Sequence, residues 1–383
     1  MGFSDAPSAR DLFEDARAYW ASPVDVEGDA GDHHPMTRDL SAAACAPCHP
    51  QQYTEWRDSL HAQAVSPGLL GQLGALSRRE RRSCLACHLP AASQQTIWEG
   101  DALEARAKLD GVDCAACHVR GQQRFGPRER ATTPHGPVAG ADFFRGSEFC
   151  APCHQFGAEG VAVNGKPLEN TYEEWRVSRY PVRGQTCQSC HMPGGSHRFA
   201  GIHDPVMTAR ALRVTAVRAP TGVEVELANE GAGHALPTYS VPRIRVQVSV
   251  AGGAAPAALE HPIQRRMDWD AEQGWSERAD TRLMPGQSTR LVQPLPASAR
   301  AEVTVRVEPD ADYYERVYPA LLQTLAGEAS AEELELLEEA RRRAGESPYV
   351  LARISCGAWE GETAPCVPGA PPVDARSGPA TPP

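Results

Sequence analysis

The chain has 383 residues and a formal net charge of −11, and its length predicts two or three domains. The acidic balance argues against nucleic acid as a partner, because a phosphate backbone requires a basic surface. No run approaches the roughly 18 apolar residues of a membrane-spanning helix. Glycine and proline, 33 residues each, predict a loop-rich chain, and an aromatic fraction of 6% is small for large conventional cores.

The first 44 residues are polar, with one short amphipathic segment. Apolar residues at helical spacing predict a helix from Asp11 to Trp20. His33 and His34 follow in a flexible stretch, either as solvated loop residues or as an arm that ligates a metal. The opening carries many carboxylates and no apolar core of a secretory signal.

The motif Cys-x-x-Cys-His occurs five times between residues 45 and 191. This motif attaches c-type haem, because its two thiols add to the vinyl groups and its histidine supplies one axial nitrogen to the iron. The thiols belong to Cys45, Cys48, Cys84, Cys87, Cys114, Cys117, Cys150, Cys153, Cys187 and Cys190, and the imidazoles to His49, His88, His118, His154 and His191. The sequence therefore predicts five haem c groups, whose apolar bodies compensate for the lean aromatic content.

Zinc is the alternative, since Cys-x-x-Cys is half of a tetrahedral zinc site. Zinc requires no histidine directly after the second cysteine, and it favours an even number of half-sites, whereas this chain has five. Both features favour haem.

A helix is predicted from Gln51 to Ala64, with Tyr53, Trp56 and Leu60 on one face and His61 beside it. A related segment precedes the fifth motif. Residues 172–180 repeat the Tyr, Glu, Trp, Arg and Ser of residues 53–61 and place a tyrosine where His61 stands.

Five irons have ten axial positions, and the motif histidines fill half of them. Eight other histidines remain for the five vacancies, so methionine ligation is not required. Bis-histidine ligation leaves no open coordination site and therefore favours electron carriage over substrate binding. The candidate second ligands are ranked with His61, His135 and His234 first, then His197 and His203, then one of His33 or His34.

Local sequence supports this ranking. Pro and Gly on both sides of His135 predict a rigid turn that presents its ring. His197 and His203 lie in one glycine-rich loop, from which they can reach two different irons. His234 lies in Gly231–Thr238, on a strand connection, whereas His261 is predicted to be a plain loop residue.

From about residue 207 the composition changes and alternation of apolar and polar residues predicts strands. They are Leu212–Val217, Val223–Leu227, Ile244–Val250, Thr289–Gln293 and Ala301–Val307, and they fit a small antiparallel β-sandwich. Helices are predicted over Asp312–Leu325 and Ala331–Ala344, the second capped by Ser330 and stopped by Gly345.

The last two cysteines, Cys356 and Cys366, suggest a disulfide and an oxidising compartment. The predicted class is α+β. A loop-rich, mainly helical pentahaem domain spans residues 1–205, the β-sandwich 206–310, and a helical segment with the disulfide loop and a Pro-rich tail 311–383.

Several stretches resemble bacterial multihaem c-type cytochromes. They include Tyr53, Trp56, Ser59 and His61 after the first motif, Gly111–Cys114, Asn170–Trp175, Cys187–Pro193 and the loop Gly231–Thr238. The resemblance covers roughly residues 40 to 310, and one departure is Tyr239, where glycine commonly follows Pro-Thr.

The resemblance implies electron transfer by one-electron hopping, in the periplasm or at the cell surface, with redox proteins or an extracellular acceptor as partners. Some members stack into extracellular filaments, so a homo-oligomer or filament is a further hypothesis. We expect that an export signal is missing from this sequence, because c-type haem is attached outside the cytoplasm in such families.

Two alternatives stay open. A reductase of a small nitrogen or sulfur oxyanion needs a five-coordinate haem, which pentahaem nitrite reductases mark with Lys in place of the motif histidine. No Cys-x-x-Cys-Lys occurs here. The second alternative is that the chain is the haem subunit of a membrane redox complex. Such a subunit would need a partner that is anchored in the membrane.

Overall fold

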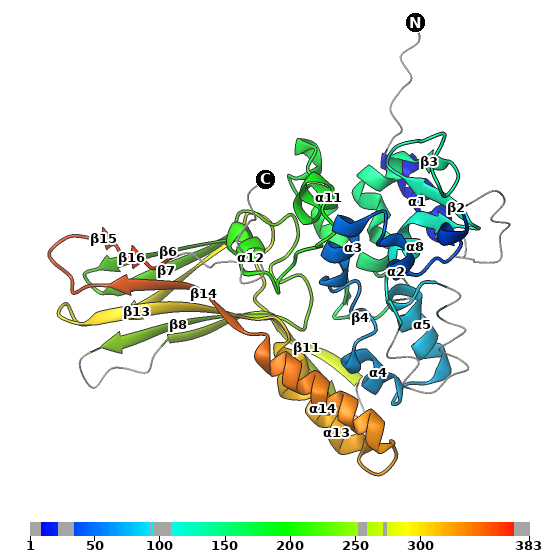
Figure 1. The fold of residues 1–383 in the computed structure, drawn as a ribbon. Helices are drawn as coiled ribbons and strands as arrows, with labels where there is room; N and C mark the ends of the chain where they lie inside the picture. The colour runs from blue at the N-terminus through cyan, green and yellow to red at the C-terminus, as the bar shows by residue number, and fades with distance from the viewer. Residues whose placement is uncertain are drawn as a thin grey trace, which may run out of the picture. The chain divides into compact units, whose positions relative to one another are not determined.

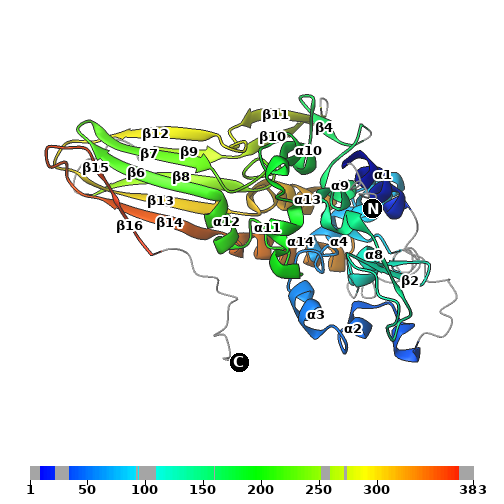
Figure 2. The same cartoon turned by 90° about the horizontal axis from the view of Figure 1, so that it is seen from above.

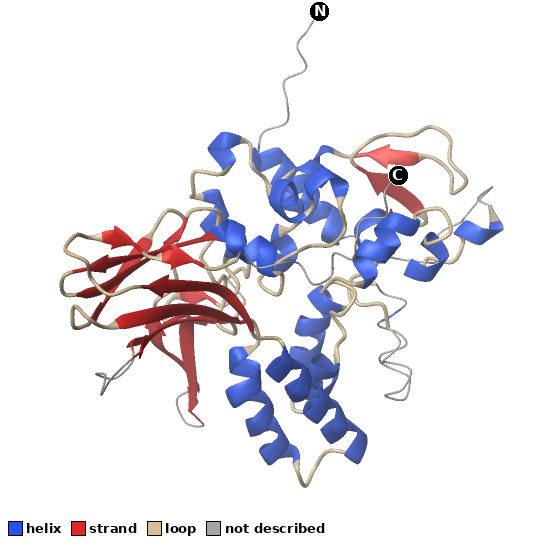
Figure 3. Cartoon of the chain, turned by 60° about the vertical axis from the view of Figure 1, so that its left-hand side comes forward, coloured by secondary structure: helices blue, strands red, loops and turns tan. Residues whose placement is uncertain are grey.

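The computed structural model describes residues 9–21, 34–91, 94, 109–158, 160–251, 259–270 and 274–370. Helices and antiparallel sheets both occur (Figure 3), which confirms the predicted α+β class. Backbone contacts group the chain into two compact units. The first comprises Met1–His154, Gly184–Phe199 and Tyr318–Arg341, and the second Gln155–Arg183, Ala200–Val317 and Arg342–Pro383. Over the residues that the structure describes, no helix combines the length and apolar character needed to cross a bilayer.

The first unit consists mainly of short helices joined by loops (Figure 1). They are α1 (Ala9–Ala21), α2 (Ala42–Cys45), α3 (Pro50–Arg57), α4 (Pro67–Leu73), α5 (Arg78–His88), α8 (Cys114–His118), α9 (Ala151–His154), α11 (Cys187–His191), α13 (Tyr318–Leu325) and most of α14 (Ala331–Glu346). Strands β1 (Val119–Arg120), β2 (Gln123–Gly126) and β3 (Val138–Gly140) form a small sheet.

The apolar clusters of this unit are small. Ala16 and Tyr19 of α1 are buried against Phe143, as the predicted amphipathic helix requires. A second cluster joins Leu70 and Leu73 of α4 to Leu85 of α5.

The helix predicted from Gln51 to Ala64 is shorter than expected. Helix α3 ends at Arg57, because the Ser59 N–H binds the Trp56 carbonyl at 2.8 Å and tightens the chain into a turn. Trp56 is buried as predicted, but Leu60 is 53% exposed and His61 lies beyond the helix. In the related segment, helix α10 (Thr171–Arg176) ends in the same way, because the Ser178 N–H donates to the Trp175 carbonyl at 2.9 Å.

The second unit contains the predicted β-sandwich (Figure 2). Its four-stranded sheet has the order β12-β7-β6-β15, and its five-stranded sheet the order β16-β14-β13-β8-β9. The bounds are β6 (Leu212–Ala219), β7 (Gly222–Asn229), β8 (Arg243–Ala251), β9 (Leu259–Ile263), β12 (Ser288–Pro294), β13 (Arg300–Glu308), β14 (Tyr349–Cys356), β15 (Ala364–Pro365) and β16 (Val367–Pro368). All five predicted strands are present, and their alternate apolar residues form one core.

Two parts of this unit differ from the sequence prediction. His261 lies on strand β9, not in a plain loop, and its backbone pairs with Val246. Strand β14 pairs with β13, so the sandwich includes part of the range 311–383. Cys356 and Cys366 are disulfide-bonded as expected, and they lie in the core of the sandwich. Helix α12 (Pro205–Ala211) and the hairpins β4 (Ala162–Val163)–β5 (Lys166–Pro167) and β10 (Arg265–Asp270)–β11 (Gly274–Asp280) complete the unit.

The C-terminal helices follow the prediction closely. A π-helical turn (Tyr313–Val317) leads into α13. Ser330 and Glu333 form the expected capping box at the start of α14, whereas the helix continues one residue past Gly345.

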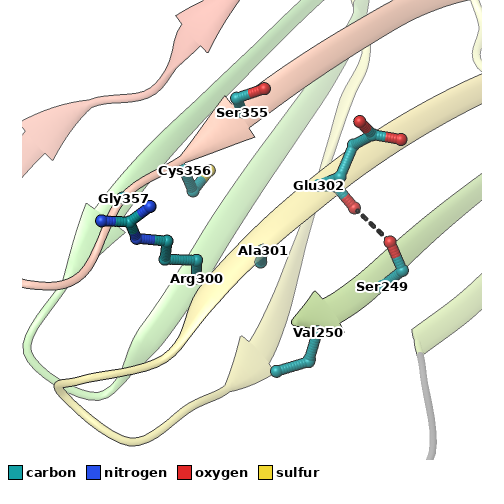
Figure 4. Close-up of a pocket in the computed structure, with 8 residues that line it drawn as sticks. All are labelled: Ser249, Val250, Arg300, Ala301, Glu302, Ser355, Cys356 and Gly357. Atoms are coloured by element: carbon teal, nitrogen blue, oxygen red, sulfur yellow. Dashed lines mark hydrogen bonds between the residues drawn. The ribbon is translucent and has the colours of Figure 1, made fainter. Parts of the chain in front are cut away.

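A pocket of about 380 Å³ lies on the five-stranded sheet (Figure 4). Among its lining residues only Arg300 and Glu302 are charged, and the Ser249 hydroxyl donates to the Glu302 carbonyl. It offers no cluster of titratable groups, and we assign it no function.

Candidate haem centre

Each Cys-x-x-Cys-His motif forms about one turn of helix. In the first and fourth motifs the histidine N–H binds the carbonyl of the first cysteine, at 3.0 Å for His49 and for His154. Residues three and four apart lie on one face of a helix, so each turn presents both thiols and the imidazole together. This is the arrangement that covalent haem attachment requires.

Side-chain caps begin the helices that carry or lead into four of the five motifs, and Asp113 and Thr186 stand directly before the first cysteine. Ser41, Ser77, Asp113 and Thr186 each accept a hydrogen bond from a backbone N–H in the first turn. The hydrogen bond of the Asp113 cap is the shortest of these, with Oδ1 2.7 Å from the Ala116 nitrogen. All ten motif cysteines stay partly accessible, with Cys48 exposed and the other nine half-buried.

Three motif imidazoles each face an imidazole from a distant part of the chain. The ring centres of His49 and His135 lie 6.4 Å apart, those of His154 and His61 6.2 Å, and those of His118 and His197 6.3 Å. All three partners are among the candidate second ligands predicted from the sequence.

These separations match the space that an iron needs. A metal–imidazole bond is about 2.0 Å long. The nitrogen lies roughly 1.2 Å from the ring centre, so two imidazoles on opposite sides of one metal have centres about 6.4 Å apart. The residues present therefore fit haem iron with two axial imidazoles.

Hydrogen bonds orient several of these rings. The Nδ1 atoms of His118 and His197 lie 2.9 Å from the carbonyls of Phe125 and Gly195, and Nδ1 of His135 lies 2.7 Å from the Thr133 hydroxyl. A carbonyl only accepts, so Nδ1 carries the proton in His118 and His197 and Nε2 is the ligating nitrogen. Metal-bound histidines are commonly fixed in this way by a partner on the other nitrogen.

The electrostatics favour the neutral ring that a metal requires. Burial and the neighbouring ring of His154 lower the pKa of His61 to about 3. Phe199 packs edge-on against His61, with ring centres 4.3 Å apart. Burial also lowers the pKa of His118, His135 and His197.

The remaining candidates differ from these three. The Nε2 atom of His203 lies 2.9 Å from a carboxylate oxygen of Asp310, and its Nδ1 is buried without a partner. His34 accepts a hydrogen bond at Nδ1 from the Met36 N–H and caps a short turn. His33 lies outside the described residues. None of these observations tests the predicted ligand roles of His203, His33 or His34.

The His234 loop is held by a separate set of contacts within the second unit. Asn229 spans it, donating to the His234 carbonyl and accepting from the Ala232 N–H. Glu174 of α10 accepts from the Ala235 N–H at 2.9 Å. The ring Nδ1 of His234 donates to the Ala235 carbonyl, also at 2.9 Å, so Nε2 would be its ligating nitrogen.

Thiols from different motifs lie side by side in the first unit. The thiol of Cys45 lies within interaction distance of that of Cys114, as does Cys87 of Cys153 and Cys150 of Cys187. A further link is the Ser147 hydroxyl, which accepts from the Cys187 N–H at 3.0 Å. Motifs 1 and 3, 2 and 4, and 4 and 5 are therefore spatial neighbours, an order that the sequence did not reveal.

The zinc alternative finds no support here. Within the described ranges, no group of three or more His, Cys, Asp or Glu side chains gathers as a metal site of protein ligands alone requires.

Comparison with known proteins found one family and one solved structure that resemble this chain. A family model described as cytochrome c554 and c-prime matches residues 44–119, which contain the first three motifs. A crystal structure of a penta-heme cytochrome c552 from Thermochromatium tepidum matches with a TM-score of 0.59 and 19% identity, over 87% of this chain and 100% of that one. Among curated proteins no sequence matches. The fold is that of a multihaem c-type cytochrome, as the resemblance of the motifs predicted.

Proposed function

We propose that this chain is an electron carrier that binds five haem c groups and passes electrons among them one at a time. Bound haem supplies the one-electron couple between ferric and ferrous iron. The observation that carries the proposal is the set of three imidazole pairs with centres 6.2 to 6.4 Å apart. Two imidazoles on one iron leave no position for a substrate, which favours electron transfer over catalysis.

The neighbouring thiols support an order for the electron path. Cys45 and Cys114 connect the first motif to the third, and Cys150 and Cys187 connect the fourth to the fifth. Cys117 lies close enough to Cys150 and Cys153 to interact with both electrostatically, which brings the third motif near the fourth. We infer the order 1–3–4–5, with the second motif beside the fourth.

For motifs 2 and 5, the candidate second ligands are His203, His234, His33 and His34, or a histidine of another subunit. A histidine from a second copy would make each chain one link of a filament, which is the extended form of the proposal. The matched solved structure is described as penta-heme, which supports the proposal of five haem groups.

A location outside the cytoplasm, in the periplasm or at the cell surface, forms part of the proposal. The Cys356–Cys366 disulfide supports it, because disulfides persist in oxidising compartments. Redox proteins or an extracellular acceptor are the expected partners.

Expression with a cytochrome c maturation system tests the function. We expect intact mass to equal the polypeptide plus five haem groups, and the ferric protein to give low-spin electron paramagnetic resonance signals. A chain that takes up no covalent haem would contradict the proposal. A high-spin ferric signal that nitrite or cyanide shifts would favour the reductase.

A further inference from the structure

Arg120 is a buried cation next to the third motif. It follows His118 by two residues, on β1, and is 8% exposed. Its Nε donates to the Tyr19 carbonyl at 2.9 Å, and its Nη1 donates to the carbonyls of Ala116 and Val119 at 3.0 and 2.6 Å. The guanidinium carbon lies 3.8 Å from the centre of the Tyr19 ring.

Nη2, the other terminal nitrogen of Arg120, is buried and has no hydrogen-bond partner among the described residues, although it carries two N–H groups. Among the described residues no carboxylate pairs with Arg120. A buried charge left without a counter-ion is strongly destabilising, as is a buried donor left unsatisfied.

The described polypeptide around Arg120 supplies no lasting anion. Its charge interacts with Tyr19, Cys117 and His118, and Trp20 lies over the guanidinium. Burial raises the pKa of the Tyr19 hydroxyl well above its usual range, so the phenol stays neutral. The Cys117 sulfur becomes a neutral thioether once haem is attached.

We propose that Arg120 pairs through Nη2 with a propionate carboxylate of a haem group. This proposal rests on haem attachment, and it assigns Arg120 as a positioning residue. Guanidinium and carboxylate form the stronger, charge-assisted class of hydrogen bond. A cation held at the propionate favours the electron on that haem, so Arg120 raises the reduction potential of one site.

Arg218 of β6 provides a matched comparison. It is also a buried arginine, 4% exposed, but both of its terminal nitrogens donate to backbone carbonyls and only Nε is unpaired. It lies in the sandwich, where no haem motif occurs. Arg218→Gln therefore controls for the loss of a buried guanidinium.

The test compares Arg120→Gln, Arg120→Lys and Arg218→Gln in the haem-loaded protein. Haem content is measured first by mass, which separates failure of this proposal from failure of haem attachment. The readouts are the five reduction steps in a potentiometric titration and the infrared bands of haem labelled with ¹³C at the propionate carboxylates.

We expect Arg120→Gln to lower the equilibrium constant for reducing one site about tenfold, which is about 59 mV for one electron, and to shift one labelled carboxylate band. Arg120→Lys should restore most of the potential, since it keeps the charge, while the band stays shifted because the planar fork is lost. Arg218→Gln should change neither readout. Should Arg120→Gln fail to fold, an Arg120→Lys spectrum identical to that of the parent protein overturns the proposal. Unchanged potentials and bands in a fully loaded Arg120→Gln protein overturn it as well.

Discussion

The imidazoles of His49 and His135 lie 6.4 Å apart, centre to centre, with their planes inclined by 27°. One belongs to the first haem motif and the other to a turn that closes with the Gly136 N–H on the Thr133 carbonyl. The chain folds these two rings into the spacing of opposite ligands on one metal. This relationship leads to the first prediction.

Replacing His135 by methionine should raise the reduction potential of one site, because a thioether ligand raises the potential relative to a second imidazole. The other four sites should change little. Potentiometric titration with optical detection measures the effect. His261→Gln, on strand β9, is the control and should leave all five steps unchanged. An unaltered titration for His135→Met would argue that His135 is not a ligand.

Glu174 and its neighbour Glu173 should differ sharply in their effect on stability. Glu174 is 4% exposed and accepts from the buried Ala235 N–H, while the nearby Arg282 keeps its closer ion pair with Asp280. Glu174→Ala therefore leaves the Ala235 N–H unsatisfied and should cost about 1–3 kcal/mol. Glu173 forms an exposed ion pair with Arg176, and Glu173→Ala should cost less than about 1 kcal/mol. Denaturant titration of the two variants compares the free energies of unfolding. Equal losses would refute the assigned roles.

Asp280 should make the stability of the protein depend on pH in the acid range. Burial alone would raise the pKa of Asp280, but hydrogen bonds from Arg282 and Lys166 hold it well below its usual range. The pKa of an aspartate in the unfolded chain is about 3.9, so ionised Asp280 stabilises the folded protein above this pH. This stabilisation is lost as the pH falls toward the lower pKa of the folded state. Asp280→Asn should therefore be less stable than the parent at pH 6, and the difference should shrink below about pH 4. A difference independent of pH would contradict this assignment.

The Cys356–Cys366 disulfide closes a loop with a sequence separation of 10 residues. Replacing both cysteines by alanine should lower the free energy of unfolding by about 2–3 kcal/mol, through the gain in entropy of the unfolded chain. Thermal unfolding of the parent and the variant, monitored by far-ultraviolet circular dichroism, measures the loss of stability of the sandwich. The five reduction potentials serve as the internal control, and a change in them would indicate that the disulfide affects the haem sites.

Local patterns predicted much of this fold. Alternation over Ala301–Val307 identified β13, and the spacing of Ala16 and Tyr19 identified α1, because both patterns report which face of an element is buried. The five motifs predicted the cofactor for a similar reason, since a single helical turn fixes their geometry.

Long-range partnerships were not predictable. His61 pairs with the ring of His154, and His197 with that of His118, through tertiary folding that no local spacing encodes. Likewise, the turn that ends α3 at Arg57 depends on burial of Trp56, whose indole N–H binds the Val112 carbonyl. The sequence supplied eight candidate histidines, and only folding selects among them.

A density map of the haem-loaded protein at side-chain resolution tests the central claim most directly. The account predicts an iron between His49 and His135, a second between His118 and His197, and a third between His154 and His61. A different residue, or an open coordination position, opposite His49, His118 or His154 would contradict it.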